Sequence, residues 1–279
     1  MKILVLGSGG MLGHKMLERL KLHHPYVEGV SRKNFKTATK ANFDATDSGK
    51  VMQVFNYYKP DVVVNCLGVI KQRTSQGMQS VNALLPHFLS RQCEERGAYL
   101  IHFSSDCVFS GKKGMYTEKD APDAEDLYGL TKAVGEITDS KNTLTLRTSI
   151  VGRERANYLG LLEWFLRQTG EIQGHENAIF SGVTTEWLSS LVAELIYWPK
   201  RLSGLYNVAT EPVSKFELLK IFQRTYNKQG VTIIPVSEPR CDRSLDPTKF
   251  KHDTLISIPS IEHMVEGQRN LDKGSGYAI

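Results

Sequence analysis

The sequence is poor in cysteine, and its few thiols follow no disulfide or metal-binding pattern. Among 279 residues there are four cysteines, none in a Cys-x-x-Cys pair: Cys66, Cys93, Cys107 and Cys241. The eight histidines show no ligand spacing either. These absences argue against a disulfide framework and a zinc site, and we expect a cytoplasmic protein without metal catalysis.

Long apolar runs and long runs of one charge are also missing. No segment approaches the roughly 20 apolar residues of a membrane span. Only four apolar residues follow Met1-Lys2 before glycines begin, so we expect no signal peptide. The formal net charge is +5, and Lys and Arg are scattered. This pattern argues against nucleic-acid and membrane partners and suits an anionic small substrate or cofactor.

What the chain does contain is an alternation of strand and helix patterns. Through about residue 150 this alternation predicts an α/β fold with a Rossmann-type, doubly wound parallel sheet. At 279 residues the chain is long enough for such a domain and a smaller lobe. We expect residues 1–152 to form an NADP-binding Rossmann domain and residues 153–279 to form a smaller C-terminal substrate-binding lobe, interleaved with the sheet.

Apolar periodicity and turn residues place the individual elements. We expect strands at residues 2–6, 26–30, 61–65, 99–103, 143–147, 205–208 and 231–234. Helices are expected at residues 12–20, 49–58, 79–96, 158–168, 185–197 and 215–228. Pro86 should kink or break its helix. A third strand should end near Asp44, and the chain after Ile234 resembles a loop-rich tail.

A glycine-rich turn joins the first strand to the first helix. Residues 7–13 read GSGGMLG, and strand, glycine turn and helix together are the context in which such a motif binds a pyrophosphate. Gly7 permits the turn, Gly10 lets the backbone approach the phosphates, and Gly13 lets the helix pack on the strand. Met11 and Leu12 begin the helix, whose free N–H groups face the anion. Similar turns occur without a ligand, but this position favours binding.

Other candidate cofactor residues follow the next strands. An acidic residue after the second strand would favour NAD, whereas Arg32 can accommodate the 2′-phosphate of NADP. We therefore predict NADPH as the cofactor, with NADH as the alternative. It also remains open that Arg32 and Lys33 bind no cofactor and simply form a solvated basic loop. Asp44 falls near the expected adenine position. Asn65 and Gly68 are the first and last residues of a compact turn, where the chain is expected to pass under the cofactor.

Tyr128 and Lys132 form a Tyr-x-x-x-Lys pair. On a helix, side chains four residues apart share a face, with Cβ atoms about 5–6 Å apart. A unit charge about 4 Å from the phenol, at an effective dielectric of about 20, is worth about 4 kcal/mol and would bring the phenol pKa from about 10 to near 7. Such a phenol is a general acid/base at neutral pH. This pair of residues is common on helix surfaces, so the pattern alone is weak evidence. Its interpretation depends on the other motifs in the chain.

Four features occur together in chain order: the glycine turn, the segment Asn65-Cys66-Leu67-Gly68, Ser105, and Tyr128 with Lys132. As an ordered set they resemble the extended short-chain dehydrogenase/reductase superfamily and, within it, the dTDP-4-dehydrorhamnose reductase family. The resemblance covers nearly the whole chain. Residues 101–111 (IHFSSDCVFSG) are similar to that family's Ser-Thr-Asp-Tyr-Val-Phe-x-Gly segment, and residues 146–149 (LRTS) and 244–250 (SLDPTKF) match further blocks.

The resemblance implies NAD(P)H-dependent reduction of the 4-keto group of a nucleotide-linked 4-keto-6-deoxy sugar, in deoxysugar or surface polysaccharide biosynthesis. Ser105 would hydrogen-bond the substrate oxygen, Tyr128 would give it a proton, and Lys132 would hold the nicotinamide ribose. The partner is then a nucleotide-diphosphate sugar, and a homodimer is the assembly to test for. The substrate-binding candidates are Ser105, Asp106, Cys107, Tyr128, Arg240 and Arg243.

The sequence departs from the family at two places. Residues 239–243 (PRCDR) stand where the family has Arg-Pro-Gly-Asn, so Arg240 and Arg243 are either diphosphate contacts or ordinary surface arginines. Residue 107 is Cys where rhamnose reductases have Tyr. GDP-fucose synthase, which epimerises and reduces, is similar in having a cysteine at this offset. Cys107 is therefore either an acid/base for epimerisation or a small residue of the pocket wall.

Three alternatives remain beside simple reduction. A bifunctional epimerase/reductase would need a histidine partner for Cys107, and between residues 151 and 165 only Arg153 and Tyr158 lie near the expected place. A 4,6-dehydratase would carry Glu where Cys107 stands. A non-catalytic NADP-binding regulatory subunit would usually lose Tyr128 or Lys132, which are both present. We therefore predict a sugar-nucleotide 4-ketoreductase.

Overall fold

The computed structural model describes residues 1–32, 43–70, 75–155 and 158–273. The chain divides into two compact units. The first consists of Met1–Val108, Pro122–Arg147 and Ser189–Tyr206, and the second of Phe109–Ala121, Thr148–Leu188 and Asn207–Ile279. Each unit is therefore built from segments that are separate in the sequence.

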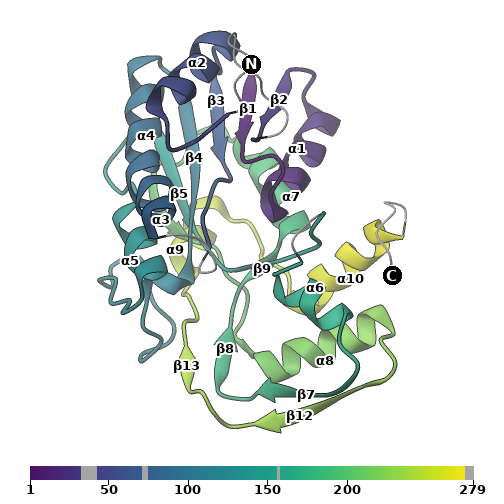
Figure 1. The fold of residues 1–279 in the computed structure, drawn as a ribbon. Coiled ribbons are helices and arrows are strands. Elements are labelled where there is room, and N and C mark those ends of the chain that lie inside the picture. Colours follow the sequence, from purple (N-terminus) through teal and green to yellow (C-terminus); the bar gives the residue numbers. More distant parts are fainter. Residues whose placement is uncertain (33–42, 71–74, 156–157, 274–279) are drawn as a thin grey trace. The chain divides into compact units, whose positions relative to one another are not determined.

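A six-stranded sheet forms the centre of the first unit (Figure 1). Its strands are β1 (Ile3–Leu6), β2 (Val27–Val30), β3 (Val62–Asn65), β4 (Tyr99–Ser104), β5 (Thr143–Arg147) and β10 (Gly204–Asn207). Their order is β10-β5-β4-β3-β1-β2, and the pairs among β1 to β5 are parallel. The order reverses between β1 and β3, and open α/β sheets bind ligands at such a switch point, beyond the carboxyl ends of the strands.

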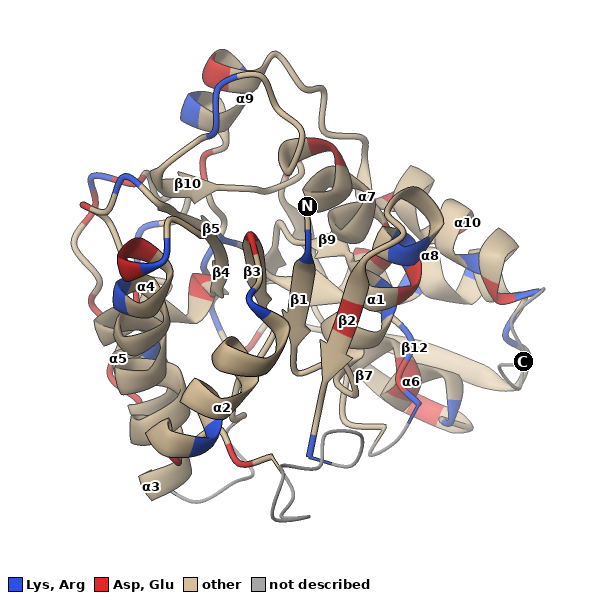
Figure 2. Ribbon diagram, turned by 90° about the horizontal axis from the view of Figure 1, so that it is seen from above, with Lys and Arg blue, Asp and Glu red and all other residues tan. Residues whose placement is uncertain are grey.

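Helices cover both faces of this sheet (Figures 1 and 2). One face carries α2 (Ser48–Tyr58), α4 (Leu85–Glu95) and α5 (Leu127–Val134), and the other carries α1 (Met11–His23). Asp47 caps α2 by accepting a hydrogen bond from the Lys50 N–H at 3.1 Å, and Asp126 caps α5 through the Gly129 N–H at 2.9 Å. Each cap contributes about 1 kcal/mol to its helix. The predicted Rossmann-type class is confirmed.

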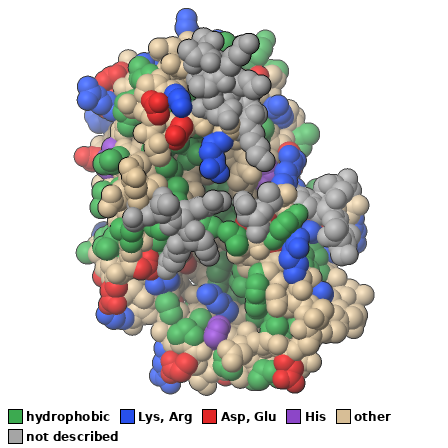
Figure 3. Space-filling view, in the orientation of Figure 1, with side chains coloured by type: hydrophobic (Ala, Val, Ile, Leu, Met, Phe, Trp, Pro, Cys, Tyr) green, Lys and Arg blue, Asp and Glu red, His purple; other side chains and the backbone are tan. Residues whose placement is uncertain are grey.

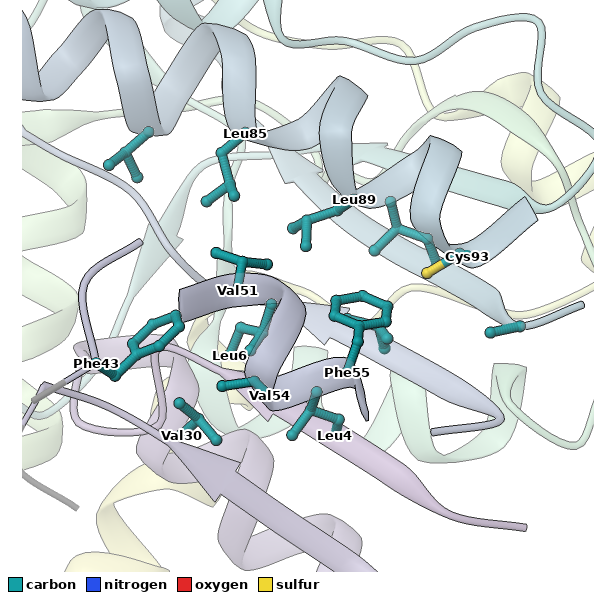
Figure 4. Close-up of a cluster of buried hydrophobic side chains, with 14 residues drawn as sticks. Leu4, Leu6, Val30, Phe43, Val51, Val54, Phe55, Leu85, Leu89 and Cys93 are labelled. Atoms are coloured by element: carbon teal, nitrogen blue, oxygen red, sulfur yellow. The ribbon is translucent and has the colours of Figure 1, made fainter. Parts of the chain in front are cut away.

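The core of the first unit fills the space between α2, α4 and the sheet (Figure 4). The side chains that meet there are Leu4 and Leu6 of β1, Val51, Val54 and Phe55 of α2, and Leu85, Leu89 and Cys93 of α4. None of them is more than 4% exposed. Full burial of a large apolar side chain contributes roughly 1.5–3 kcal/mol, so this layer holds the helices on the strands whose ends form the candidate site.

The helical segment before residue 96 is not broken at Pro86, because Leu84 and Leu85 keep right-handed helical φ and ψ angles. α3 (Ser75–Met78) continues into a π-helical stretch, η1 (Gln79–Leu84), and α4 begins at Leu85. Pro86 lies in the first turn of α4, directly after the π-helical stretch. The change from π-helix to α-helix therefore precedes the proline.

The second unit contains short strands and helices around its own core. The strands are β6 (Ile150–Val151), β7 (Gly170–His175), β8 (Ala178–Phe180), β9 (Val183–Thr184), β11 (Val213–Ser214), β12 (Val231–Val236) and β13 (Cys241–Asp242). The helices are α6 (Leu161–Leu166), α8 (Lys215–Tyr226), α9 (Thr248–Thr254) and α10 (Ile261–Asp272), while α7 (Thr185–Leu195) has residues in both units. Phe165, Leu218, Phe222 and Val265 are central to the core.

Several expected elements differ from the structure. The loop-rich tail is wrong, because α9 and α10 occupy much of it, and β7 and β8 were not expected. Ser260 caps α10, and Ile261, Met264 and Val265 bury a stripe at helical spacing. The expected third strand lies largely in residues 33–42, outside the described residues, and residues 43–47 form no strand.

The surface agrees with the scattered charge of the sequence. Blue and red segments are spread over many helices and loops in Figure 2, and on the face in Figure 3 the basic side chains form no continuous patch. Within the described ranges, no helix is long and apolar enough to span a membrane.

Candidate active site

The glycine turn lies between β1 and α1, at the switch point of the sheet. Gly7 has φ +82°, and a Cβ there would lie 3.0 Å from the carbonyl carbon and oxygen of Cys66. A Cβ on Gly13 would lie 2.1 Å from the Gly7 oxygen, so neither position accommodates a side chain. At Gly10, by contrast, a Cβ would meet only the Gly7 oxygen, at 3.4 Å. The backbone is therefore open at the residue predicted to face the phosphates.

The start of α1 has the properties of an anion site. Gly10 is the N-cap residue, no side chain among the described residues caps the helix, and its first turn has no acidic residue. Met11 is half-buried and Leu12 is buried, so their contribution to ligand binding would come from backbone N–H groups. A dinucleotide pyrophosphate fits this cradle, because helix N-termini offer unpaired N–H groups and a positive dipole.

Arg32 lies directly beyond β2, which ends at Val30, and its side chain is exposed. The adjacent Ser31 is the nearest neighbour of a Cβ placed on Gly9, at 3.6 Å, so this end of β2 borders the glycine turn. Asp44 is close enough for Arg32 to contribute to the lowered pKa of its carboxyl, although hydrogen bonds from Thr46 are the main cause. Lys33 lies outside the described residues.

The turn after β3 is held by two buried asparagines. Asn65 accepts a hydrogen bond from the Leu67 N–H at 3.2 Å and pairs with His102 at 3.1 Å. Asn82, from η1, bonds both the N–H and the C=O of Val69 at 2.8 Å. A Cβ on Gly68 would meet only Asn82, at 4.0 Å. Asn65 therefore fixes the shape of the turn from inside, and Asn82, which sequence reasoning missed, fixes its far end.

Helix α5 is packed directly against the segment that follows β4. Tyr128 and Lys132 lie one turn apart on α5, as predicted. Between them, Gly129 approaches the backbone so closely that a Cβ would lie 2.1 Å from the Cys107 oxygen and 2.5 Å from the Cβ of Ala124. Only glycine allows this approach, which brings Tyr128 beside Ser105. Sequence reasoning assigned Gly129 no role, although it occupies the second position of the Tyr-x-x-x-Lys motif.

Hydrogen bonds join the candidate catalytic groups within the first unit. Tyr128 hydrogen-bonds to Ser105. Ser105 Oγ donates to a carboxylate oxygen of Asp106 at 3.0 Å and accepts from the Cys107 N–H at 3.1 Å. Lys132 Nζ donates to the Phe103 carbonyl oxygen at 2.6 Å. The structure therefore brings Ser105, Asp106, Cys107 and Tyr128 together, with Lys132 one turn along the helix.

The electrostatics of the phenol differ from the expectation. Burial raises the pKa of Tyr128 well above its usual range, and the nearby Cys107 and Asp106 add to the increase, while the hydrogen bond to Ser105 opposes it. The predicted fall of this pKa towards 7 is wrong for the chain alone, because desolvation of the phenolate dominates. The phenol is protonated at neutral pH, which is the state that a proton donor requires.

Lys132 is only 5% exposed, and burial lowers its pKa to about 8. Glu136, one turn further along the chain, opposes this effect. The sequence analysis did not select Glu136, although the spacing of four residues from Lys132 is the same as that between Tyr128 and Lys132. Of the described residues, no group of three or more His, Cys, Asp or Glu side chains is placed to hold a metal ion.

The residues considered as partners of Cys107 have other contacts. Arg153 is buried in the second unit, where its guanidinium bonds Glu163 at 2.6 Å and Asp272 at 3.3 Å. The ring of Tyr158 lies under the Arg167 guanidinium, 3.6 Å from it. Arg153 does not replace a histidine as a proton-transfer group, since arginine remains protonated.

The two candidate phosphate-binding arginines belong to the second unit, on either side of β13. Arg240 is exposed and lies 3.9 Å from the Glu238 carboxylate. Arg243 is half-buried, and its Nε donates to the Phe109 carbonyl oxygen at 2.7 Å. Arg240 is thus a solvated side chain, whereas Arg243 also anchors the backbone at Phe109.

The sequence of this chain is similar to a protein family and to individual proteins from bacteria. The model of the family described as "RmlD substrate binding domain" matches residues 1–265. The "Spore coat polysaccharide biosynthesis protein SpsK" of Bacillus subtilis (strain 168) is 25% identical over 221 residues, which cover 76% of this chain and 74% of the relative. A "dTDP-4-dehydrorhamnose reductase" of Streptomyces griseus is 31% identical over 138 residues, 48% of this chain and 43% of the relative.

Another relative has a different kind of name. The "Methionine adenosyltransferase 2 subunit beta" of Rattus norvegicus is 28% identical over 148 residues, 51% of this chain and 44% of the relative. The match therefore spans less than half the length of that protein, as it does for the Streptomyces reductase.

A solved structure has the same fold. The crystal structure of dTDP-4-dehydrorhamnose reductase from Bacillus anthracis str. Ames in complex with NADP has a TM-score of 0.80 at 23% identity, and the match covers 95% of this chain and 97% of that chain. At this identity the likeness shows the Rossmann-type fold of a parallel sheet with flanking helices.

Proposed function

The chain belongs to the RmlD substrate binding domain family, and so to the extended short-chain dehydrogenase/reductase superfamily, and from this membership we propose that it reduces the 4-keto group of a nucleotide-linked 4-keto-6-deoxy sugar with NADPH. The observation that carries the proposal is the protonated phenol of Tyr128, hydrogen-bonded to Ser105 and one helical turn from the buried Lys132. Its place at the carboxyl end of β4, in a sheet with an open glycine turn after β1, supports a dinucleotide-dependent reaction.

Each group then has a defined role in the reduction. When bound, NADPH supplies the hydride that reduces C4. Ser105 hydrogen-bonds the substrate oxygen, and Tyr128 transfers its proton to that oxygen as the C=O bond becomes C–OH. The Lys132 cation stabilises the phenolate that remains and holds the nicotinamide ribose. The raised pKa of Tyr128 suits this direction, because a weak acid stays protonated until negative charge develops on the substrate oxygen.

The assay follows NADPH oxidation with dTDP-, UDP-, GDP- and CDP-linked 4-keto-6-deoxy sugars, using Tyr128→Phe as the control for background oxidation. We expect turnover with at least one of these sugars. If the wild-type chain binds NADPH but oxidises it no faster than Tyr128→Phe with every sugar, the reductase proposal fails.

The cofactor is tested separately through Arg32. Because Arg32 is exposed beyond β2, beside the glycine turn, it can pair with a 2′-phosphate. We expect NADPH to bind more tightly than NADH, and Arg32→Ala to narrow the difference by about tenfold or more, as for a lost charge-assisted hydrogen bond. Fluorescence titration of both cofactors measures this, and a wild-type preference for NADH contradicts it.

A second candidate is a non-catalytic dinucleotide-binding subunit. The similarity to a methionine adenosyltransferase subunit favours it, whereas the retention of Ser105, Tyr128 and Lys132 favours catalysis. NADPH binding without turnover on any sugar in the panel is the outcome that selects the subunit.

A further inference from the structure

A buried ion pair lies behind the catalytic lysine in the first unit. Arg147, the last residue of β5, is 1% exposed, and its Nε and Nη2 atoms lie 2.8 Å and 2.6 Å from the two carboxylate oxygens of Glu136. The Glu136 side chain is 5% exposed. Ser104 Oγ donates a third hydrogen bond to this carboxylate at 2.6 Å. Glu136 is therefore fixed from two strands at once.

Strand β4, which holds Glu136 through Ser104, also holds Lys132. The carbonyl oxygen of Phe103, the neighbour of Ser104 in β4, accepts a hydrogen bond from Lys132 Nζ at 2.6 Å. Consecutive residues of β4 thus hold the ammonium and the carboxylate, which are themselves four residues apart in the chain. Ser105 directly follows Ser104, the last residue of β4. A displacement of Glu136 would therefore be transmitted both to Lys132 and to the serine.

The charges around Lys132 make the carboxylate important. Burial disfavours the ammonium, and of the described groups Glu136 opposes this effect. His102 of β4 is fully buried, and burial lowers its pKa well below the usual range, so its imidazole is neutral. From α5, Tyr128 is protonated, and Asp106 and Cys107 of the segment after β4 act on that phenol.

We propose that Glu136 is a positioning residue, which keeps Lys132 protonated and seated against β4 so that its cation is available to Tyr128 and to the nicotinamide ribose. The proposal rests on the proposed function. A Glu136 that served only as the partner of Arg147 would affect stability but not the pH at which NADPH binding is lost.

The test is the pH dependence of NADPH affinity, measured by fluorescence titration from pH 6 to 10, together with the pH profile of turnover. In the wild type, affinity should fall as pH rises through the pKa of Lys132, about 8. Glu136→Gln keeps the size of the side chain but removes the charge. Because the carboxylate raises the pKa of Lys132, its loss should move this alkaline limb to lower pH by about one unit.

Glu163→Gln is the matched control, since it neutralises a buried glutamate that pairs with Arg153 in the second unit. It should lower the unfolding temperature without moving the limb. If Glu136→Gln does not fold, the double variant Glu136→Gln with Arg147→Gln carries the test, because removing both charges leaves no unpaired buried ion. The limb should still move to lower pH, but by less than in Glu136→Gln, because the Arg147 cation is removed together with the carboxylate.

An unshifted limb in the folded variant overturns the role of Glu136, as does a wild-type affinity that stays constant up to pH 10. The affinity measurements need no sugar. A wild type with pH-dependent NADPH binding but no turnover therefore refutes the reductase and leaves the inference about Glu136 standing. A wild type that binds no NADPH overturns both.

Discussion

Gly129→Ala should inactivate the protein without touching a catalytic side chain. The added Cβ would lie 2.1 Å from the Cys107 oxygen and 2.5 Å from Ala124 Cβ, whereas ordinary contact begins at 3.4 Å. The start of α5 must therefore move by about 1.3 Å relative to the segment after β4. This movement separates Tyr128 from Ser105, and a displacement of about 1 Å can cost on the order of 10²-fold in rate.

The stability cost should be roughly 1–3 kcal/mol, as for other overpacked positions. Gly267→Ala is the control: it lies within α10 and has nothing within 4 Å of the new Cβ, so it should stabilise by roughly 0.5–1 kcal/mol. Urea unfolding and NADPH-dependent turnover are measured for both. If Gly129→Ala retains wild-type turnover and stability, α5 does not pack as described, and the reasoning fails.

Three further predictions address other residues. Tyr128→Phe should keep NADPH affinity but lower turnover by roughly 10²–10⁴, the usual contribution of an acid/base group, and unchanged turnover would remove the phenol from the mechanism. In deuterated water the product should carry no deuterium at C3 or C5, since Arg153, which stands near the expected place of the histidine, is held by Glu163 and Asp272; deuterium there that disappears in Cys107→Ser would establish epimerisation instead. Arg153→Met should cost roughly 3–5 kcal/mol in urea unfolding, because the Glu163 and Asp272 carboxylates stay buried without their arginine; a loss below about 1 kcal/mol would contradict this.

Local signals in the sequence were sufficient for the sheet of the first unit. β1, β3 and β5 are short apolar runs bounded by turn residues, and they lie within one residue of the predicted ranges. The glycine turn and the helical spacing of Tyr128 and Lys132 are also short-range patterns. The expectation of a loop-rich tail is wrong in part because Ser260, which follows Pro259, is the cap of α10.

The electrostatics of the site could not be predicted in the same way. Helical spacing fixes where the Cβ of Lys132 lies but not where its long side chain ends, and its acceptor, Phe103, is 29 residues away in the sequence. Burial of Tyr128 likewise depends on the approach of α5 to Cys107 across Gly129. The roles of Asn82 and Glu136 required knowledge of which strand ends and helices meet.

The buried cluster around Asp272 has a consequence for where the protein can be shortened. The Asp272 carboxylate accepts hydrogen bonds from the Tyr226 hydroxyl at 2.7 Å, from Gln268 at 2.9 Å and from Arg153 at 3.3 Å. The match to the family model ends at residue 265, about two helical turns before this carboxylate. A chain trimmed at that boundary would leave the Arg153 guanidinium and the Tyr226 hydroxyl facing a gap in the core. The end of the family-model match and the end of the packed core therefore differ, and a shortened chain should keep residues through Asp272.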